Sequence, residues 1–287
     1  MDSLRTSSLF HYPQKLDTLK KILVQGFKPN YCKETFTILD TPDLIVGIPM
    51  VSFCDIPLTR ITNFKNRYNE YAIGLSKEWG FKNGVNPVFY ATDNSRISSS
   101  LRIIKQMSEK MNEHLIEHIN AFGKPMEING QTVQTLGRKL NDPNLCNDIQ
   151  LFKDNVNFFQ IRSTLFGFTK SYHGNFKNKL QSNYEENEWR FVLDESALTP
   201  INWFWGNDSY LNWRGNEKHK PISLFNSLMF DIEDVNFIIL RDESQIPRMV
   251  KYIEGLEEFG GSIIKDKSQK SILISKIISM DRINKDF

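Results

Sequence analysis

Residues 184–193 restrict the fold most, because charged and bulky apolar side chains alternate along this stretch. In an extended strand, alternate side chains point to opposite faces. One face would then carry Glu186, Glu188 and Arg190, and the other face would be apolar. Because Glu is depleted in strands, such a strand is either the solvated edge of a sheet or a way to aim carboxylates into a cleft.

The N-terminal part of the chain predicts a short strand followed at once by a helix. Residues 8–12 predict a strand that Pro13 stops, and residues 16–26 carry apolar side chains at helical spacing. Gly26 suits the left-handed position just past a helix end. His11 therefore lies where the strand turns into the helix, and by itself it fits either a packing residue or a binding residue.

The rest of the chain predicts an α+β protein. Strands are expected at residues 48–53, 71–75, 86–91, 235–240 and 272–274, and helices at 58–68, 95–122 and 244–254. No repeat, low-complexity tract or obvious linker divides the sequence. We therefore expect one α+β domain over residues 1–287, with a mainly helical insertion at about 95–165.

The formal net charge of +2 excludes a uniformly basic nucleic-acid binder but leaves room for a local basic groove. One candidate combines Lys177 and Lys179 with Tyr172 and His173. Phosphates could pair with the lysines there, and bases could stack on the rings. An exposed polar loop is the alternative interpretation of this stretch.

Metal, disulfide and membrane sites find no support in the sequence. The three cysteines form no C-x-x-C pair, and His114 and His118, four apart on a predicted helix, lack an evident third ligand. No apolar run reaches about 18 residues, and the N-terminus has no basic-then-apolar signal. We therefore expect no metal, no membrane partner, and a soluble, cytoplasmic protein.

Several enzyme motifs are missing from the chain. There is no G-x-x-x-x-G-K-[ST] loop, no G-x-G-x-x-G and no G-x-S-x-G, so a Walker ATPase, a Rossmann domain and an elbow-type hydrolase are not indicated. NAD bound by another fold is not excluded. Among Glu185, Glu186 and Glu188, only two could share the carboxylate site of a metal-dependent nuclease, because adjacent strand residues face opposite ways. A nuclease-like toxin stays a third hypothesis.

Four motifs, at residues 51–58, 71–80, 86–90 and 186–190, together resemble the AbiGi-type abortive phage-resistance proteins. The resemblance spans residues 8–275 in one order, and the insertion is covered least. That family is labelled as the antitoxin partner in a phage-resistance system, which implies a cognate toxin or antitoxin protein as a partner. The label describes a context and leaves the chemistry open.

A second resemblance, to ADP-ribosyltransferases, implies a mechanism. The chain has a strand that ends in His11, a helix that leads to Gly-Phe-x-Pro at residues 26–29, a middle strand that opens with Tyr71, and a late Glu-x-Glu strand. This order is similar to the His-Tyr-Glu layout of those enzymes, although a clear Ser-Thr-Ser motif is missing. The DarT toxins, which modify DNA, and the CmdT toxins, which modify mRNA, are nearest in style. The resemblance implies an ADP-ribosyltransferase-like split mixed β-sheet with helices and a helical insertion.

The same resemblance assigns binding roles to single residues. His11 would hold the adenosine-side ribose of NAD, the co-substrate. Tyr71 would stack on the nicotinamide ring, and Ser76 or Tyr90 could fill that role instead. Arg190 could bind the pyrophosphate bidentately or neutralise its neighbours.

Cleavage of the nicotinamide glycosidic bond explains the need for carboxylates. The ribose becomes oxocarbenium-like, and a carboxylate bound to its hydroxyl gains strength as positive charge develops. The resemblance assigns this catalytic role to Glu188. Glu186, about 7 Å away along an extended strand, could orient or deprotonate an acceptor.

We therefore expect an NAD-dependent ADP-ribosyltransferase that acts as an anti-phage or toxin–antitoxin effector. Its acceptor would be a nucleic acid, either mRNA or DNA, or else a protein. The alternative is a non-catalytic antitoxin or sensor that keeps the fold and works by binding. Loss of NAD on expression would distinguish the two hypotheses.

Overall fold

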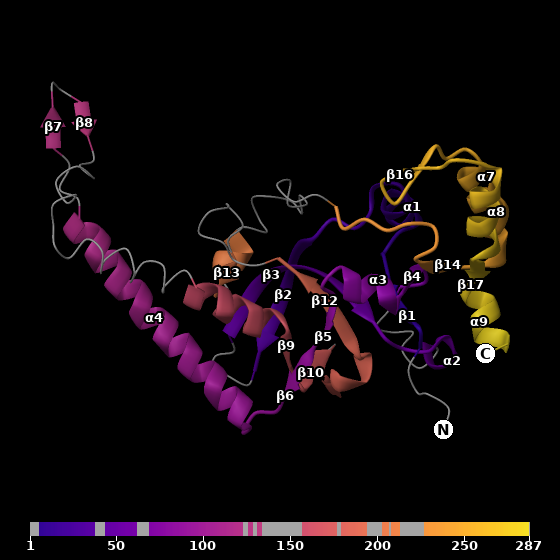
Figure 1. Ribbon diagram of the computed structural model, residues 1–287. Coiled ribbons are helices and arrows are strands. Elements are labelled where there is room, and N and C mark those ends of the chain that lie inside the picture. The colour runs from indigo at the N-terminus through magenta and orange to yellow at the C-terminus, as the bar shows by residue number, and fades with distance from the viewer. Residues whose placement is uncertain are drawn as a thin grey trace.

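The computed structural model has a mixed β-sheet at its centre, with helices around it (Figure 1). In spatial order the sheet contains β17 (Ile277–Ser279), β14 (Val235–Leu240), β4 (Ala72–Ser76), β1 (Ser8–His11), β3 (Leu44–Cys54), β12 (Glu188–Val192) and β5 (Asn86–Pro87), and β2 (Asn30–Phe36) and β13 (Phe204–Trp205) also pair with β3. Its pairs are antiparallel except for the parallel pair β14–β17. The predicted α+β class is confirmed. The structure describes residues 6–37, 44–61, 69–122, 126–128, 131–133, 157–176, 179–193, 203–206, 208–212 and 227–286.

The helix α1 illustrates how local sequence produces these elements. Leu19 and Ile22 lie at helical spacing and are buried. Gly26 follows the helix with a φ of 69°, and a Cβ there would lie 2.6 Å from the carbonyl oxygen of Leu228. Glycine is therefore required on both grounds, and the helix predicted at 16–26 is confirmed. The named helices are α1 (Leu16–Gln25), α2 (Leu58–Ile61), α3 (Lys77–Lys82), α4 (Arg96–Phe122), α7 (Ile246–Glu254), α8 (Lys267–Ser275), α9 (Met280–Asp286) and the 3-10 helices η3 (Tyr184–Glu186) and η4 (Glu243–Gln245).

One edge of β3 pairs with two different strands, which leave a gap between them. Its first part, up to Met50, pairs with β2, and its last residue, Cys54, pairs with β1. Because β12 pairs with both Met50 and Cys54 from the opposite edge, β1 and β2 share one edge of β3 and separate between these two residues. The carbonyl of Ser52 lies in this gap and accepts a hydrogen bond of 2.8 Å from Nδ1 of His11. A side chain thus replaces the backbone donor that a continuous ladder would supply.

Two short strands close the base of the predicted insertion. β6 (Phe89–Ala91) precedes α4, β9 (Thr169–Ser171) follows a helix at residues 157–167, and the two strands pair in parallel. α4 runs away from the sheet, whereas α7, α8 and α9 lie at the other end, near β14 and β17 (Figure 1). The helix predicted at 95–122 is confirmed. The remaining hairpins are β7 (Met126–Ile128) with β8 (Gln131–Val133), β10 (His173–Phe176) with β11 (Lys179–Ser182), and β15 (Glu258–Phe259) with β16 (Ser262–Ile263).

The largest apolar cluster joins α1, α7 and α8 to the sheet. Leu23, Ile253 and Leu273 from these helices are buried with Leu75 and Ile238 of the strands. Full burial of one such side chain stabilises the fold by about 1.5–3 kcal/mol relative to exposure. The strand predicted at residues 235–240 is confirmed as β14, between β4 and β17.

One local prediction is wrong, and another is only partly right. Residues 272–274 belong to α8, because the side chain of Asp266 caps a helix by accepting a hydrogen bond from the backbone of Gln269. Residues 86–91 form β5 and β6 in two different sheets, since the chain changes its partner from β12 to β9 within this run. Residues 62–68 of the helix predicted at 58–68 lie outside the described residues, as does much of the insertion before residue 157.

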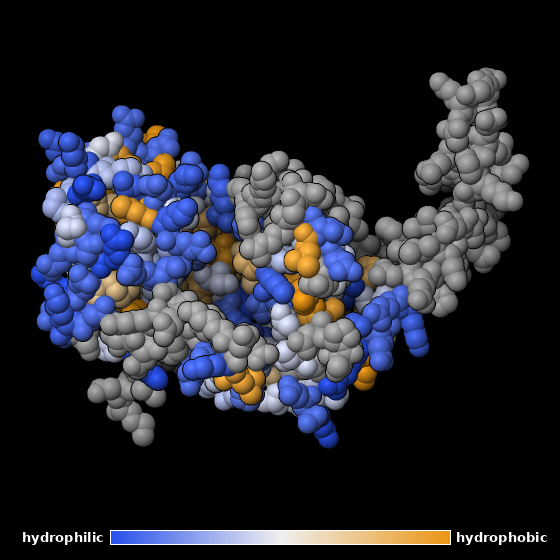
Figure 2. Space-filling model, turned by 180° about the vertical axis from the view of Figure 1, so that it is seen from behind, coloured by the Kyte–Doolittle hydropathy of each residue, from blue (hydrophilic) through white to orange (hydrophobic). Residues whose placement is uncertain are grey.

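The face shown in Figure 2 is mostly hydrophilic, with small hydrophobic patches scattered over it. A helix that crosses a bilayer needs about 20 predominantly apolar residues. Within the described ranges, none of the helices combines that length with that apolarity.

Candidate active site

A cleft of about 340 Å³ opens where β1 and β2 separate. Its walls come from β1, β2, β3, β9, η3 and β12, which lie far apart in the sequence. It is lined by Phe10, His11, Tyr12, Cys32, Glu34, Met50, Ser52, Phe53, Cys54, Lys170, Glu186 and Glu188. The fold therefore brings His11, Glu186 and Glu188, three of the residues singled out from the sequence, to one cleft.

The segment that carries the carboxylates is only partly extended. β12 begins at Glu188, whereas Tyr184–Glu186 is a 3-10 helix, so the prediction of one strand over residues 184–193 is wrong in its first half. Asn187 joins the two parts in the left-handed conformation, with φ 42° and ψ 51°. Asn is one of the few side chains that adopt this conformation readily. Alternation along a strand cannot reveal such a turn, yet Glu186 still lines the cleft.

We expect Asn187→Ala to lower the free energy of unfolding by about 1–2 kcal/mol, because a Cβ without a compensating polar side chain is strained at positive φ. Asn187→Gly should stay within about 1 kcal/mol of the wild type, since glycine adopts this conformation freely. Denaturant unfolding of both variants measures the difference. Equal losses would show that the asparagine side chain, and not the backbone conformation, stabilises the turn.

Five charged side chains form one connected cluster at the cleft. Glu188 accepts hydrogen bonds from Nε of Arg190 and from Nζ of Lys170, both at 2.7 Å. Lys170 also donates to Glu186 at 3.0 Å. Nη2 of Arg190 contacts Oε1 of Glu34 at 2.9 Å. Among the described residues, three carboxylates thus meet two cations.

Arg190 lies behind the cleft and neutralises its neighbours. It is 0% exposed, and its Nη1 donates to the carbonyl of Gly167 at 2.9 Å while its other nitrogens contact Glu188 and Glu34. Arg190 is absent from the residues that line the cleft. Of its two sequence-based roles, the structure supports charge neutralisation.

The cluster fixes the ionisation of its members. Burial by itself would raise the pKa of Glu188, but Arg190 and Lys170 outweigh burial and hold that pKa well below its usual range. Burial by itself would lower the pKa of Lys170, but the surrounding carboxylates, Glu188 first, raise it above its ordinary value. At neutral pH the cleft therefore contains an ionised Glu188 beside a protonated Lys170.

His11 presents one ring nitrogen as an acceptor. Its Nδ1–H donates to the carbonyl of Ser52, so the neutral ring has a lone pair on Nε2. Phe27 and Phe53 contact the ring edge-on, with centroids 5.3 Å and 5.8 Å away. Burial lowers the pKa of His11 more than the Ser52 hydrogen bond raises it, so the ring is neutral at pH 7. Such a nitrogen can accept a hydrogen bond from a ribose hydroxyl.

The other three predicted residues lie outside the set that lines the cleft. The hydroxyl of Tyr90 accepts a hydrogen bond of 2.8 Å from the backbone N–H of Glu188, so it supports the site from behind. Tyr71 packs in the main core, and the side chain of Ser76 caps α3. Phe53, which does line the cleft, is 2% exposed and packs in the same core as Tyr71.

The sequence-based prediction omits two members of the charged cluster. Glu34 lies on β2, whose run of Tyr, Cys, Lys, Glu and Thr looks like a solvated loop until it pairs with β3. Lys170 lies on β9, at the start of a basic and aromatic stretch that indicated phosphate contacts. The basic character of that stretch was the available signal, but it did not reveal a contact with Glu188.

That aromatic stretch presents rings beside the cleft. Tyr172 and Tyr184 stack with centroids 5.6 Å apart and planes at 16°. Tyr184 is exposed and lies on η3, the 3-10 helix that also carries Glu186. Lys177 lies outside the described residues, as do the side chains of His114 and His118.

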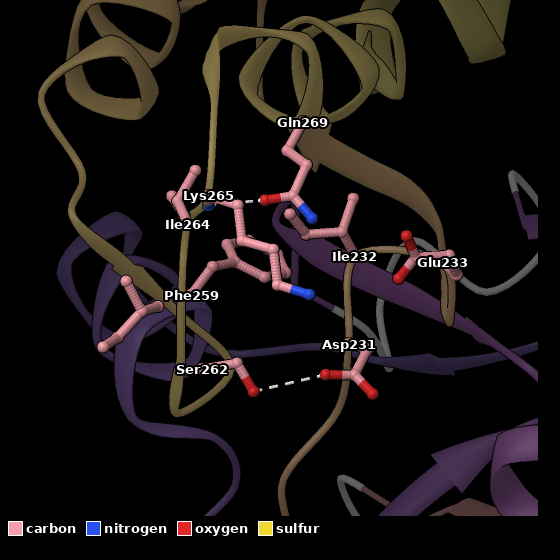
Figure 3. Close-up of a pocket in the computed structure, with 9 residues that line it drawn as sticks. Asp231, Ile232, Glu233, Phe259, Ser262, Ile264, Lys265 and Gln269 are labelled. Atoms are coloured by element: carbon pink, nitrogen blue, oxygen red, sulfur yellow. Dashed lines mark hydrogen bonds between the residues drawn. The ribbon is translucent and has the colours of Figure 1, made fainter.

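A second cavity, of about 460 Å³, lies between the turn at residues 231–233 and the segment leading into α8 (Figure 3). Asp231, Glu233 and Lys265 line it, and Ser262 donates a hydrogen bond of 3.2 Å to Asp231. None of the residues predicted from the sequence lies in it. Volume alone does not make a site, and the smaller cleft combines a neutral histidine with an ionised, buried carboxylate, Glu188.

Residues 25–241 match the model of a family described as "Putative abortive phage resistance protein AbiGi, antitoxin". The chain is also similar to a protein of Lactococcus lactis subsp. cremoris described as "Abortive phage resistance protein AbiGi". The two are 26% identical over 278 residues, which cover 91% of this chain and 100% of that protein. No solved structure matches the chain. The family match includes the whole charged cluster, from Glu34 to Arg190.

Proposed function

This chain belongs to the AbiGi family of abortive phage resistance proteins, and we propose that within this defence it is an NAD-dependent ADP-ribosyltransferase. The observation that supports the proposal is that His11 and Glu188, far apart in the sequence, line one cleft. One presents a neutral acceptor nitrogen, and the other is an ionised carboxylate of low exposure. An ADP-ribosyltransferase must hold a ribose and stabilise a cationic transition state. An acceptor nitrogen suits the first task, and an ionised carboxylate suits the second.

The charge of the cleft suits the nicotinamide end of NAD. That end is cationic, and positive charge moves onto the ribose as the glycosidic bond breaks. Glu188, which lines the cleft, is ionised and of low exposure. At a position shielded from water, its negative charge is worth more than it would be at the surface.

Each residue then has a role that its contacts allow. Glu188 stabilises the positive charge on the ribose, and because it stays ionised it acts as a fixed charge and not as a proton donor. His11 accepts a hydrogen bond from a ribose hydroxyl through Nε2. Glu186, less buried than Glu188, takes the proton that the acceptor loses when it attacks the ribose carbon. Tyr90 keeps the first residue of β12 in place.

We place the acceptor among the nucleic acids, mRNA or DNA, ahead of proteins. The support is the exposed ring of Tyr184, which lies two residues before Glu186 and stacks on the ring of Tyr172. An unpaired base can stack on such a ring at a gain of about 1–3 kcal/mol. An acceptor held there would lie next to the carboxylate that we assign to its deprotonation.

A non-catalytic antitoxin or sensor is the second candidate. The description of the family ends in "antitoxin". In addition, Lys170 already contacts both Glu186 and Glu188, which is compatible with a cleft that binds without turning over. In that case the chain would act by binding a cognate toxin. The cleft would be retained as part of the fold, but it would not catalyse ADP-ribosyl transfer.

Incubation of the full-length protein with NAD labelled in its adenosine half tests the proposal. RNA, single-stranded DNA and a protein mixture are offered as acceptors in separate reactions. We expect release of nicotinamide and transfer of the label to a nucleic acid. If the protein neither releases nicotinamide nor binds NAD in calorimetry, the transferase proposal is contradicted. Rescue of cells from a neighbouring gene product would then establish the antitoxin alternative.

A further inference from the structure

The peptide group that joins Asn187 to Glu188 is held at both ends. Its carbonyl oxygen accepts a hydrogen bond of 3.0 Å from the backbone N–H of Asp55. Its N–H donates a hydrogen bond of 2.8 Å to the hydroxyl of Tyr90. Because the oxygen and the hydrogen of a trans peptide point in opposite directions, Asp55 and Tyr90 hold the group from opposite sides. The direction of the Glu188 side chain therefore depends on both contacts.

Asp55 is itself held in place by a buried ion pair. Its side chain is 4% exposed, and its Oδ2 lies 2.7 Å from Nζ of Lys77. Its other carboxylate oxygen accepts a hydrogen bond of 3.2 Å from the backbone N–H of Thr6. Each oxygen of the carboxylate thus has a partner, so the residue that holds the Asn187 carbonyl has little freedom to move.

Lys77 connects strands that are not neighbours in the sheet. It is the first residue of α3 and directly follows β4, whereas Asp55 directly follows β3. Since β1 lies between β4 and β3, the ion pair reaches past the start of β1. The ammonium also lies 5.7 Å from the centroid of the Trp189 ring on β12. Trp189 follows Glu188 and faces the opposite side of the strand, so Lys77 supports β12 from behind the cleft.

These contacts bring together all four motifs of the sequence. Asp55 belongs to residues 51–58, Lys77 to 71–80, Tyr90 to 86–90, and Asn187 to 186–190. The charged cluster at the cleft takes no side chain from the first two motifs. The ion pair therefore gives these two motifs a role next to the proposed catalytic carboxylate.

We propose that Asp55 and Lys77 are positioning residues for Glu188. Lys77 orients Asp55, Asp55 holds the carbonyl of Asn187, and the peptide group fixed in this way aims the Glu188 carboxylate into the cleft. The proposal rests on the transferase function above and adds two residues that lie outside the set that lines the cleft. A buried ion pair often stabilises a fold no more than apolar packing of similar volume does, so the effect expected here is on geometry.

Glu188 needs this support because the chain before it is not a strand. Asn187 is in the left-handed conformation, and the pairing of β12 with β3 starts only at Glu188↔Cys54. The end of a strand opens more easily than its middle. The hydrogen bond from Asp55 to Asn187 extends the pairing by one step beyond Glu188, so the proposed catalytic residue is no longer the last one held.

Amide hydrogen exchange in the full-length protein tests the geometry without a substrate. In Lys77→Met we expect the N–H groups of Asp55 and Glu188 to exchange at least about 10-fold faster, because the peptide group that both depend on loses its fixed position. Leu193 is the internal control, since its N–H donates to the carbonyl of Pro49 at 2.9 Å just past the other end of β12. Its exchange rate should change much less.

The conservative variant Lys77→Arg keeps the charge and should keep the exchange rates of Asp55, Glu188 and Leu193 close to those of the wild type. Equal acceleration of all three amides in Lys77→Met would show an effect on overall stability alone. That result would overturn the positioning role.

Steady-state kinetics of NAD cleavage test the consequence for the reaction. We expect Lys77→Met and Asp55→Asn each to lower kcat about 10- to 100-fold with a smaller change in KM, since a small misplacement of a catalytic group costs up to about that much. The double variant should lose no more than either single variant, because both residues act through one ion pair. Glu243→Gln breaks the exposed pair with Arg282 and is the control that should keep the wild-type rate.

The outcomes separate this proposal from the transferase function. Faster exchange at Asp55 and Glu188 with an unchanged kcat would overturn the positioning role, and so would additive losses in the double variant. If the wild type cleaves no NAD, the transferase function fails, while the exchange rates still decide whether Lys77 and Asp55 fix the peptide group before Glu188.

Discussion

Glu188→Gln should lower the rate of NAD cleavage about 100- to 1000-fold, because the amide cannot supply the negative charge that stabilises a cationic ribose. In the wild type, Arg190 and Lys170 keep the pKa of Glu188 well below its usual range, so the charge is present throughout the neutral range. Glutamine has nearly the same shape and keeps one acceptor oxygen. The same substitution should remove toxicity in cells. Nicotinamide release and growth after induction measure the two effects.

Two neighbours of Glu188 serve as controls for this prediction. Glu185 lies on the same turn but is exposed and outside the set that lines the cleft, so Glu185→Gln should keep wild-type activity. Glu186→Gln should slow transfer to the acceptor more than it slows hydrolysis of NAD, because its proposed role begins with the acceptor. Full NAD cleavage and full toxicity in a folded Glu188→Gln variant would rule out the transferase proposal.

Arg190→Met should lower the free energy of unfolding by about 3–5 kcal/mol, because it takes the shared guanidinium away from the buried Glu188 and the partly buried Glu34. Arg190 is 0% exposed, and it contacts Glu188 at 2.7 Å and Glu34 at 2.9 Å. For a chain of this size we expect Tm to fall by roughly 10 °C. Calorimetry or circular dichroism on heating measures the change.

The loss in Arg190→Met should depend on pH in a defined direction. In the wild type the pKa of Glu188 is depressed, so its stabilising contribution is present above the usual value of 4.5 and is lost as the pH falls toward the folded-state pKa. In the variant, Glu188 can protonate and escape the penalty. The difference between the two proteins should therefore be largest at neutral pH and shrink below about pH 4.5.

An exposed ion pair provides the matched control for this loss. Arg282 contacts Glu243 at 2.8 Å, but both side chains are exposed, so Arg282→Met should cost less than about 1 kcal/mol. A loss in Arg190→Met no larger than this would show that the buried cluster does not stabilise the fold.

Local pattern predicted the elements whose structure depends on neighbours in the chain. α1 follows from the spacing of Leu19 and Ile22 and from Gly26, and α4 and β14 follow from equally regular apolar runs. The pattern failed at residues 272–274, where a helix cap outweighed three apolar residues. It also failed before Glu188, where a single left-handed residue ends the alternation.

By itself, the sequence singled out Glu186, Glu188 and Arg190 as candidates and predicted the face of β12 that Glu188 and Arg190 share. Only the tertiary structure decided that β1 and β2 separate along one edge of β3, that His11 fills the gap, and that Lys170 and Glu34 complete the charged cluster. The physical reason is that periodicity reports the face on which a residue lies, whereas strand register and order decide which distant residues lie beside it.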